Sequence, residues 1–309
     1  MGKPDVALIA GPTASGKSGL AVELALALEK QGKRGVIINA DSAQVYADLH
    51  VLSARPNDAE MAGVEHRLFG KWDGMQPCSA ADWAERAKQE IARAQGDDAV
   101  PILVGGTGMY MQVLLDGIAP IPAIDPKVRG EVRAMETATA HALLQAEDPV
   151  RADQLSPGDT QRISRALEVL RSTGRPLSYW QERNEGGISD AIILHPLVLL
   201  PAREWLYDRC DRRFIEMLEL GAMEEVEALI ARQLDPDLPI MRAIGVKEIA
   251  AYLNGESSRE EMIDAGAQAT RNYAKRQYTW FRNQPPEEWV RIESQNYDFN
   301  ALFALLLHH

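Results

Sequence analysis

Three apolar runs in the first third of the chain share one form, a short aliphatic stretch closed by small or acidic residues. They lie at 6–10, 35–42 and 100–108. Between them, at about 17–31 and 79–95, apolar residues recur with the spacing of a helix. This alternation predicts a parallel, doubly wound α/β sheet, whose ligands bind at the carboxyl ends of the strands.

The middle of the chain has a different pattern. Prolines and then charged stretches with helical spacing run from about 116 to 190, without a strand-like segment. The apolar run 191–200 predicts a strand that returns to the sheet, and Pro196 within it indicates a bulge or an edge position. Further helices follow, and 290–293 predicts a last short strand.

The length of 309 residues, with 46% hydrophobic and 25% charged side chains, is sufficient for two moderate domains. We expect an α/β core at 1–115 and 191–309, interrupted by a helical domain at 116–190. The two cysteines, Cys78 and Cys210, are too few for a disulfide framework or a four-cysteine zinc site.

The remaining composition indicates a cytoplasmic protein without a membrane partner. The sequence has neither a secretory signal nor an apolar stretch of 18 residues. Its net charge of −12 argues against indiscriminate binding of nucleic acid, because phosphate contacts need cations. Local basic surfaces remain compatible with this charge.

The segment GPTASGKS lies between the first predicted strand and helix and fits the phosphate-binding pattern G-x-x-x-x-G-K-[ST]. Its glycines let backbone N–H groups point at an anion, and the next helix adds its positive N-terminal end. Lys17 would neutralise a diphosphate, and the Ser18 hydroxyl would bind its Mg²⁺ ion. We therefore expect a P-loop NTPase-like sheet, with a diphosphate-binding loop of Gly11, Pro12, Thr13, Ala14, Ser15, Gly16, Lys17 and Ser18.

Two further segments reach the same edge of the predicted sheet. Asp41 follows the second strand in NADSAQVY, where it either caps a turn or does chemistry. The turn GGTGMY follows the third strand; its glycines allow close backbone approach, and Thr107 offers a hydroxyl to a ligand. A kinase needs an acidic metal ligand at such a strand end, so glycines at this position weaken an ATP-dependent interpretation.

Six motifs occur in the order found in one known family: GPTASGKS, DSAQVY, PILVGGTGMY, DTQRISRALEV, AIGVKE and TRNYAKRQYTWFR. With them the chain resembles the bacterial tRNA dimethylallyltransferases, or tRNA isopentenyltransferases, from residue 5 to about residue 283. The resemblance implies transfer of a dimethylallyl group from dimethylallyl diphosphate to N6 of the adenosine immediately 3′ of the anticodon. The phosphate loop would then bind this donor and not ATP.

The resemblance also implies roles for individual residues. Asp41 would accept the N6 proton, and the phosphate loop, Thr107 and Mg²⁺ would take up the leaving diphosphate. In REWLYDRCDRRFIEM, Arg213 matches the diphosphate arginine, with Arg209 one helical turn away as second choice. Contact with the tRNA anticodon stem-loop is implied for Asp41, Ser42, Ala43, Gln44, Thr107, Arg129, Gln161, Arg162, Ile163, Ser164 and Arg165.

The segment TRNYAKRQYTWFR carries four cations and no acid. Arg271, Lys275, Tyr278 and Arg282 share one helical face, which suits RNA phosphates and stacked bases. The alternative is that the aromatic residues of this segment, including Tyr273, are core and its cations are only solvated. Both interpretations stay open from the sequence.

Two segments depart from the family pattern, HVLSARP at 50–56 and VEHRLFG at 64–70, and both could alter contacts to the donor tail or the flanking bases. Three rival functions are an adenylate isopentenyltransferase that acts on free AMP, ADP or ATP, an ATP-dependent small-molecule kinase, and a nucleotide-switched RNA-binding protein. The helical insertion and the basic segment argue against the first. We expect a monomer whose partners are tRNA and dimethylallyl diphosphate.

Overall fold

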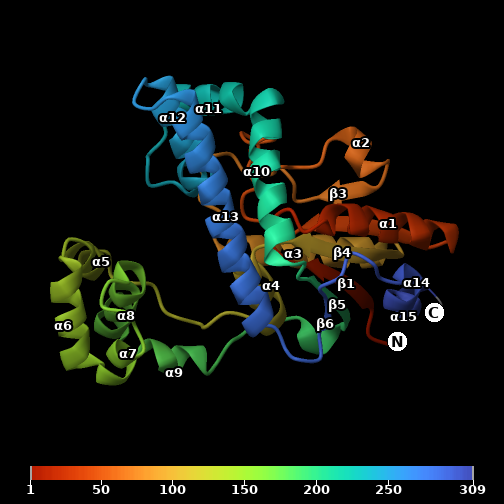
Figure 1. The fold of residues 1–309 in the computed structure, drawn as a ribbon. Helices are drawn as coiled ribbons and strands as arrows, with labels where there is room; N and C mark the ends of the chain where they lie inside the picture. The colour runs from red at the N-terminus through yellow and green to blue at the C-terminus, as the bar shows by residue number, and fades with distance from the viewer. Residues whose placement is uncertain (1, 308–309) are drawn as a thin grey trace. The chain divides into compact units, whose positions relative to one another are not determined.

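The computed structural model describes residues 2–307, which form two compact units (Figure 1). The sheet unit comprises the described residues up to Leu114 and from Ile188 onward, and the helical unit is Leu115–Gly187. The sheet has six parallel strands in the order β3-β2-β4-β1-β5-β6. Their bounds are β1 Asp5–Ala10, β2 Arg34–Asn39, β3 Glu65–Arg67, β4 Ala99–Gly105, β5 Ile193–Leu199 and β6 Val290–Ile292.

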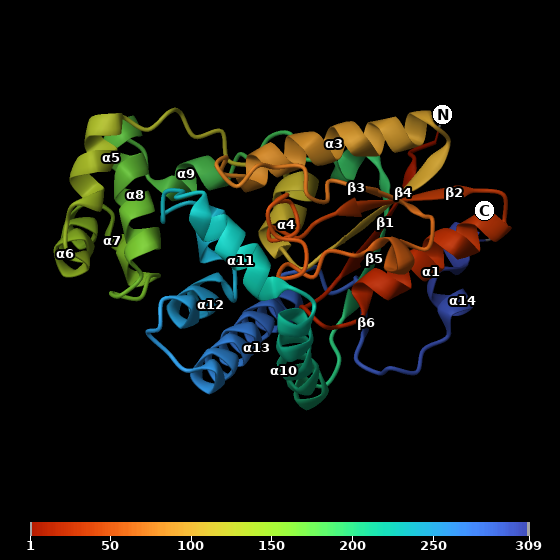
Figure 2. The same ribbon diagram turned by 90° about the horizontal axis from the view of Figure 1, so that it is seen from above.

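The doubly wound α/β fold class predicted from the sequence is confirmed. The helices α1 (Lys17–Lys30) and α3 (Ala80–Gly96) lie on opposite faces of the strands, as Figure 2 shows. Strand β1 lies between β4 and β5, and its residues from Val6 to Ala10 are fully buried. Strands covered on both faces are continuous apolar runs, which is why the sequence pattern identified them.

The second crossover is fixed by local capping and by an aromatic contact. Ser79 and Asp82 form a capping box at the start of α3, in which each side chain accepts the other residue's backbone N–H. Trp83 on the next turn is fully buried, donates its indole N–H to Asn39 O at 2.8 Å and stacks on Tyr110. This bond joins α3 to the end of β2, the position from which the Asp41 segment starts.

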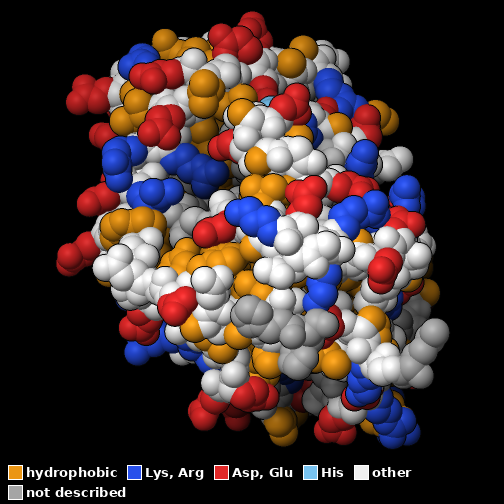
Figure 3. Space-filling view, turned by 90° about the vertical axis from the view of Figure 1, so that its right-hand side faces the viewer, with side chains coloured by type: hydrophobic (Ala, Val, Ile, Leu, Met, Phe, Trp, Pro, Cys, Tyr) orange, Lys and Arg blue, Asp and Glu red, His pale blue; other side chains and the backbone are white. Residues whose placement is uncertain are grey.

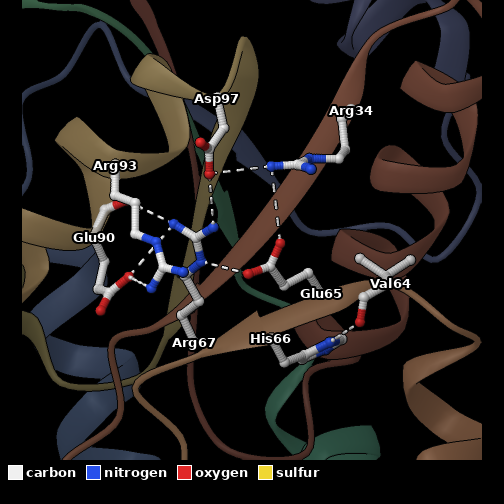
Figure 4. A network of polar contacts seen from close by, with 8 residues as sticks. All are labelled: Arg34, Val64, Glu65, His66, Arg67, Glu90, Arg93 and Asp97. Carbon is white, nitrogen blue, oxygen red and sulfur yellow. Dashed lines mark hydrogen bonds and ion pairs between the residues drawn. The ribbon is translucent and has the colours of Figure 1, made fainter.

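Strand β3 was not predicted, because its residues are charged. It pairs with β2 at the edge of the sheet, and Figure 4 shows Arg67 among three carboxylates. The Arg67 side chain is 6% exposed and lies 2.8 Å from Glu65, 3.4 Å from Glu90 and 3.5 Å from Asp97. These ion pairs offset the cost of burying the guanidinium.

Pro196 does not cause a bulge, so that alternative is wrong. The pairing of β5 with β1 runs one-to-one from Asp5 opposite Ile193 through Leu8 opposite Pro196. Strand β6 pairs with β5 only from Leu197 onward. Pro196 therefore lies where β5 has a neighbour on one side, and its missing N–H costs no ladder bond on the other.

Two long helices carry residues from distant parts of the sequence to the sheet. Helices α10 (Arg203–Glu219) and α13 (Arg259–Asn283) pack side by side (Figure 1). Phe214 is buried between them, and a Cβ at Gly266 would lie 2.1 Å from its ring. The shorter elements of this unit are α2 Asp58–Met61, α4 Gly108–Asp116, η1 Ser189–Ala191, α11 Ala222–Ala231, η2 Pro239–Arg242, α12 Val246–Leu253, α14 Phe299–Leu302 and α15 Ala304–Leu307.

The helical unit has a core of its own. Its helices are α5 Pro126–Arg133, α6 Thr137–Glu147, α7 Pro149–Asp153, α8 Thr160–Thr173 and α9 Leu177–Gln181. Val132, Leu144, Ile163 and Leu167 are buried in one apolar cluster. Ile163 and Leu167 belong to the DTQRISRALEV motif, so one face of α8 contributes to this core. Among the described residues, no helix is both long and apolar enough to cross a membrane.

Acidic and basic side chains are intermixed on the face drawn in Figure 3. Lysine and arginine residues alternate there with aspartate and glutamate and form no single basic surface. This agrees with the net charge of −12. Any anionic ligand of the protein must therefore be bound by local groups of cations.

Candidate active site

One pocket of about 280 Å³ collects residues from the ends of neighbouring strands. The phosphate loop follows β1, Asp41 follows β2, and the turn with Thr107 follows β4, which lies between those two strands. Thr13, Lys17 and Ser18 line the pocket together with the segment from Asp41 to Gln44. Residues of α10 and α13 complete the wall. The structure thus brings the predicted phosphate loop and the predicted base together.

The phosphate loop has the backbone conformation that its glycines predict. Gly16 has a φ of +94° and precedes the first residue of α1, a conformation that residues with a Cβ rarely adopt. Lys17 is buried, and its Nζ donates to Pro12 O at 3.1 Å. Burial lowers the pKa of Lys17 to about 8, and the nearby Asp41 carboxylate opposes this shift.

Asp41 is 7% exposed and lies two residues beyond the end of β2. Asn39 orients its backbone, since the Asn39 amide accepts from Asp41 N at 2.9 Å and donates to Asp41 O at 3.0 Å. Asp41 Oδ1 accepts the N–H of Ala43 at 3.0 Å. A buried carboxylate is thereby held in one orientation at the pocket wall.

Ser42 lines the pocket, and Thr107 contacts Ser42 from behind it. Thr107 Oγ1 accepts from Ser42 N at 2.9 Å and lies 3.1 Å from Ser42 Oγ. Tyr273 on α13 lines the same pocket. Burial and then Asp41 raise the pKa of Tyr273, while its hydrogen bonds to Thr107 and Ser42 act in the opposite direction. The tyrosine is therefore protonated and contacts two predicted site residues.

The two arginines of α10 that were predicted to bind diphosphate make different contacts. Arg213 lines the pocket, and burial lowers its pKa while Asp41 opposes the shift. Arg209 donates its Nε–H to Ala14 O at 2.9 Å and stacks over Trp205. Arg209 therefore supports the phosphate loop from outside, whereas Arg213 is the cation inside the pocket. Both also line an adjoining cavity of about 330 Å³ beside the phosphate loop.

The glycines of the GGTG turn are in contact with protein. A Cβ at Gly105 would lie 2.0 Å from Ala40 O, and one at Gly106 would lie 2.2 Å from Gln277 Nε2. At Gly108 the added atom would meet the ring of Trp280 at 2.3 Å. The predicted close approach is present, and the groups that approach are the Asp41 strand and helix α13.

The sequence left open whether the basic segment of α13 is an RNA-binding face or a core helix with solvated cations. The structure shows features of both. Tyr278 is buried under Arg203, so it does not belong to an exposed basic face. Arg271 pairs with Asp211. Arg276, however, lines the pocket beside Tyr273. The pattern of cations alone could not separate these positions, because they differ only in what packs against them.

Two of the RNA-contact residues predicted in the helical unit, Arg129 and Arg165, lie beside one buried carboxylate. Glu168 is 2% exposed and lies 2.8 Å from Arg133, 3.8 Å from Arg165 and 4.0 Å from Arg129. Arg133 was missed in the sequence. Gln161 and Arg162 are exposed, Ser164 is half-buried, and Arg162 pairs with Asp159 at 3.3 Å. Ile163 is fully buried, so its side chain supports the helix and offers no surface to RNA, contrary to expectation.

The two departures from the family pattern lie in different places. Leu52, Ser53 and Ala54 line the pocket. Their segment is held by Glu225, whose carboxylate accepts the backbone N–H groups of His50, Val51 and Leu52 at 2.8–3.0 Å. The segment 64–70 instead contains β3 at the edge of the sheet. Only the first departure therefore changes the pocket wall.

The residues present fit a magnesium ion bound mainly through a diphosphate. No group of three or more His, Cys, Asp or Glu among residues 2–307 could hold a metal by itself. The Ser18 hydroxyl lies in the pocket beside Lys17. Mg²⁺ usually binds through substrate phosphates with one or two protein oxygens, a donor set that Ser18 and a diphosphate can provide.

Comparisons with known proteins agree with this site. The family model described as IPP transferase matches residues 44–284. A tRNA dimethylallyltransferase from Erythrobacter litoralis is 63% identical over 99% of this chain and 97% of its own. The crystal structure of a tRNA isopentenylpyrophosphate transferase from Bacillus halodurans is 31% identical, with a TM-score of 0.69 over 99% of this chain and 95% of that one.

A third relative was crystallised as a eukaryotic dimethylallyltransferase acting on tRNA. It is 27% identical, with a TM-score of 0.76 over 90% of this chain and 70% of that one. The family model spans most of the chain, and the Erythrobacter relative matches it almost from end to end. The chain therefore belongs to the IPP transferase family, the family of the tRNA dimethylallyltransferases.

Proposed function

We propose that this protein transfers the dimethylallyl group of dimethylallyl diphosphate to N6 of the adenosine immediately 3′ of the anticodon in tRNA. N6 forms a bond to C1 of the donor, the C1–O bond breaks with its electron pair leaving on diphosphate, and N6 loses a proton. The observation that carries the proposal is a single pocket that holds a buried carboxylate, a phosphate loop and Arg213. The pocket therefore contains a candidate base for the N6 proton, a loop for the diphosphate of the donor and a cation for the negative charge of the leaving group.

Asp41 is the proposed proton acceptor. Its carboxylate is buried and oriented by Ala43 N, so it keeps one position when the adenine enters. A positioned general base contributes about 10²–10⁴-fold to rate. Thr107, Ser42 and Tyr273 form a hydrogen-bonded group beside it, which limits the directions from which the amine can approach.

Charge stabilisation of the leaving diphosphate is the larger contribution. Lys17 is buried and Arg213 is half-buried, and desolvation is the main cause that lowers the pKa of both cations. A diphosphate placed between them restores the charge partners that burial removed. The Ser18 hydroxyl would help to hold a Mg²⁺ ion, which would supply further neutralisation of the negative charge on the diphosphate. This electrostatic stabilisation is largest as the C1–O bond breaks, because the negative charge on the leaving oxygen grows at that point.

The rest of the pocket fits the hydrocarbon part of the donor. Leu52, Phe214, Met217 and Ile240 line the wall beyond the cations. An apolar wall next to a cationic end matches a small prenyl chain attached to a diphosphate. β4 ends in glycine without the carboxylate that a kinase needs for its metal, which disfavours ATP as the donor.

The helical unit is the proposed site for the anticodon stem-loop. Its cations Arg129, Arg162 and Arg165 are at least partly exposed, as phosphate contacts require. Asp41, Ser42, Ala43, Gln44 and Thr107 belong to the sheet unit, where they would contact the target adenosine. We therefore propose that the helical unit binds the stem-loop and that the sheet unit binds the target adenosine.

A cytoplasmic monomer is the proposed working form. Cys78 and Cys210 are both buried free thiols, as expected of a protein in a reducing compartment. Mass photometry at enzyme concentrations used for activity would measure the oligomeric state. A stable dimer would contradict this part of the proposal.

Incubation with radiolabelled dimethylallyl diphosphate and either tRNA or AMP tests the function. We expect label in tRNA, at the adenosine 3′ of the anticodon, and little in AMP. Label in AMP alone would identify an adenylate isopentenyltransferase. Thermal unfolding gives a second measurement, since a ligand of the folded state raises the melting temperature. Greater stabilisation by ATP with Mg²⁺ than by dimethylallyl diphosphate would favour a kinase.

A further inference from the structure

Gln277 joins two of the loops that build the pocket. It lies on α13, in the basic segment whose function the sequence left open, and its side chain is 5% exposed. Its Oε1 accepts the backbone N–H of Thr13 at 2.8 Å, and its Nε2 donates to Gly106 O at 2.8 Å. These partners lie 264 and 171 residues away in the sequence.

The two bonds require an amide at this position. Thr13 N–H can only donate and Gly106 O can only accept, which fixes the orientation of the Gln277 amide. A carboxylate would set a second acceptor against the Gly106 carbonyl, and an aliphatic side chain would leave both backbone groups unsatisfied. The hydrogen bond also requires a glycine at position 106, because a Cβ there would lie 2.2 Å from Gln277 Nε2.

Of the two loops, one belongs to the proposed binding site of the donor and the other to the proposed binding site of the acceptor adenosine. Thr13 belongs to the phosphate loop and lines the pocket on the side of the donor. Gly106 precedes Thr107, whose hydroxyl contacts Ser42 next to Asp41 on the side of the acceptor. Gln277 spans the two sides without lining the pocket itself, so it influences chemistry only through the loops that it holds.

We propose that Gln277 is a positioning residue that sets the spacing between the phosphate loop and the Thr107 turn. The inference rests on the proposed prenyl transfer, because it assumes that the donor carbon and the acceptor amine approach each other across this spacing. Bonds form between groups that must be placed within a few tenths of an ångström, so a small displacement of either loop lowers the rate. A role in stability alone would leave the rate of bound substrates unchanged.

The test compares Gln277→Leu with Phe281→Leu in full-length protein. Phe281 is fully buried one helical turn further along α13, and its ring has no polar atom, so its variant loosens the same helix and leaves both Gln277 hydrogen bonds in place. We expect Gln277→Leu to lower the single-turnover rate at saturating tRNA and donor by about 10- to 100-fold, because a misplacement of the reacting groups by about 1 Å can cost about 100-fold in rate. Its dissociation constant for dimethylallyl diphosphate should rise several-fold, with tRNA affinity unchanged. Phe281→Leu should lose thermal stability and keep the rate.

A second pair of variants keeps the inference testable if Gln277→Leu folds poorly. Gly106→Ala pushes the amide from the other side, and Gln277→Ala removes it. If both act through one contact, the double variant is no slower than the slower single variant, whereas independent effects multiply. Multiplying effects, or equal rates for Gln277→Leu and Phe281→Leu, would overturn the inference. Transfer by the unaltered protein is measured first, and its absence would count against the proposed function itself.

Discussion

At the scale of single residues, the pocket places the buried carboxylate of Asp41 near the buried Lys17 and the half-buried Arg213. Burial lowers the pKa of both Lys17 and Arg213, and Asp41 partly compensates for each. The net local charge is therefore positive in the absence of a ligand. An anion that enters this space gains more from the cations than it would at the surface, because solvent screening is weak there.

Replacement of Asp41 separates binding from chemistry. We expect Asp41→Ala to bind tRNA almost normally and to slow transfer by about two to four orders of magnitude, the range for a positioned base. Asp41→Asn keeps the shape of the side chain and should be similarly slow. Single-turnover rates on preformed complexes provide the measurement. A loss below tenfold in both variants would exclude Asp41 as the base.

Lys17 predicts a pH dependence for donor binding. Its pKa in the folded protein is lowered to about 8, so the ammonium is charged below this pH and becomes neutral above it. The affinity for dimethylallyl diphosphate should therefore be constant below pH 8 and fall by up to about tenfold per pH unit above it, since one proton is lost. Titrations between pH 6.5 and 9.5 measure this decline.

Lys17→Arg is the control for this prediction. Its guanidinium stays charged throughout the range, so any remaining pH dependence belongs to the donor or to other residues. The same decline in Lys17→Arg as in the unaltered protein would show that Lys17 does not titrate in the binding step.

At the scale of elements, the buried strands could be predicted and the charged edge could not. Strands β1, β2 and β4 are continuous apolar runs because helices cover both faces. In β3 the apolar signal is replaced by ion pairs of Arg67 with carboxylates on β3 itself and in the 90–97 region. Gln277 was missed, and Tyr273 was considered only as a core residue, because their partners are distant in sequence and no local pattern marks such contacts.

Helix α11 holds the loop 50–54, which forms part of the pocket wall, in place. Glu225 on α11 accepts three successive backbone N–H groups, of His50, Val51 and Leu52. We expect Glu225→Ala to lower the free energy of unfolding by about 1–3 kcal/mol, because these donors lose their acceptor. Glu224→Ala is the matched control, since Glu224 is exposed on the same helical turn.

Chemical denaturation measures the stability change, and donor titrations show whether it reaches the pocket. Leu52 lines the pocket directly, so Glu225→Ala should also weaken binding of dimethylallyl diphosphate. Equal stability of the Glu225 and Glu224 variants would mean that the loop holds its conformation without this carboxylate.

At the scale of the whole molecule, a protein of net charge −12 must bind a polyanion through local cations. The helical unit gathers Arg129, Arg133 and Arg165 around the buried Glu168. The carboxylate orients the arginines and neutralises only part of their charge. The family motif indicated two of these arginines, whereas Arg133 became visible only when the helices were packed.

Arg162 and Arg165 both lie on α8, and their replacement tests this helix as the RNA surface. If Arg162 and Arg165 contact phosphates, their replacement by Ala should weaken binding of the anticodon stem-loop and flatten its salt dependence. Each lost phosphate contact should reduce the log–log slope by about 0.7–0.9, through the counterions that are no longer released. Binding of dimethylallyl diphosphate should hardly change, because the donor pocket is built entirely from the sheet unit.

Arg171→Ala with Arg175→Ala is the matched control for charge, since it removes two cations from the other end of the same helix and the turn after it. Titration of labelled stem-loop at several salt concentrations gives both slopes. If the salt-dependence slope and the affinity stay unchanged in the Arg162 and Arg165 variant, these arginines are solvated side chains at a helix end and do not contact RNA. The RNA surface would then have to include the pocket rim at Arg276, where α13 places a cation beside Tyr273.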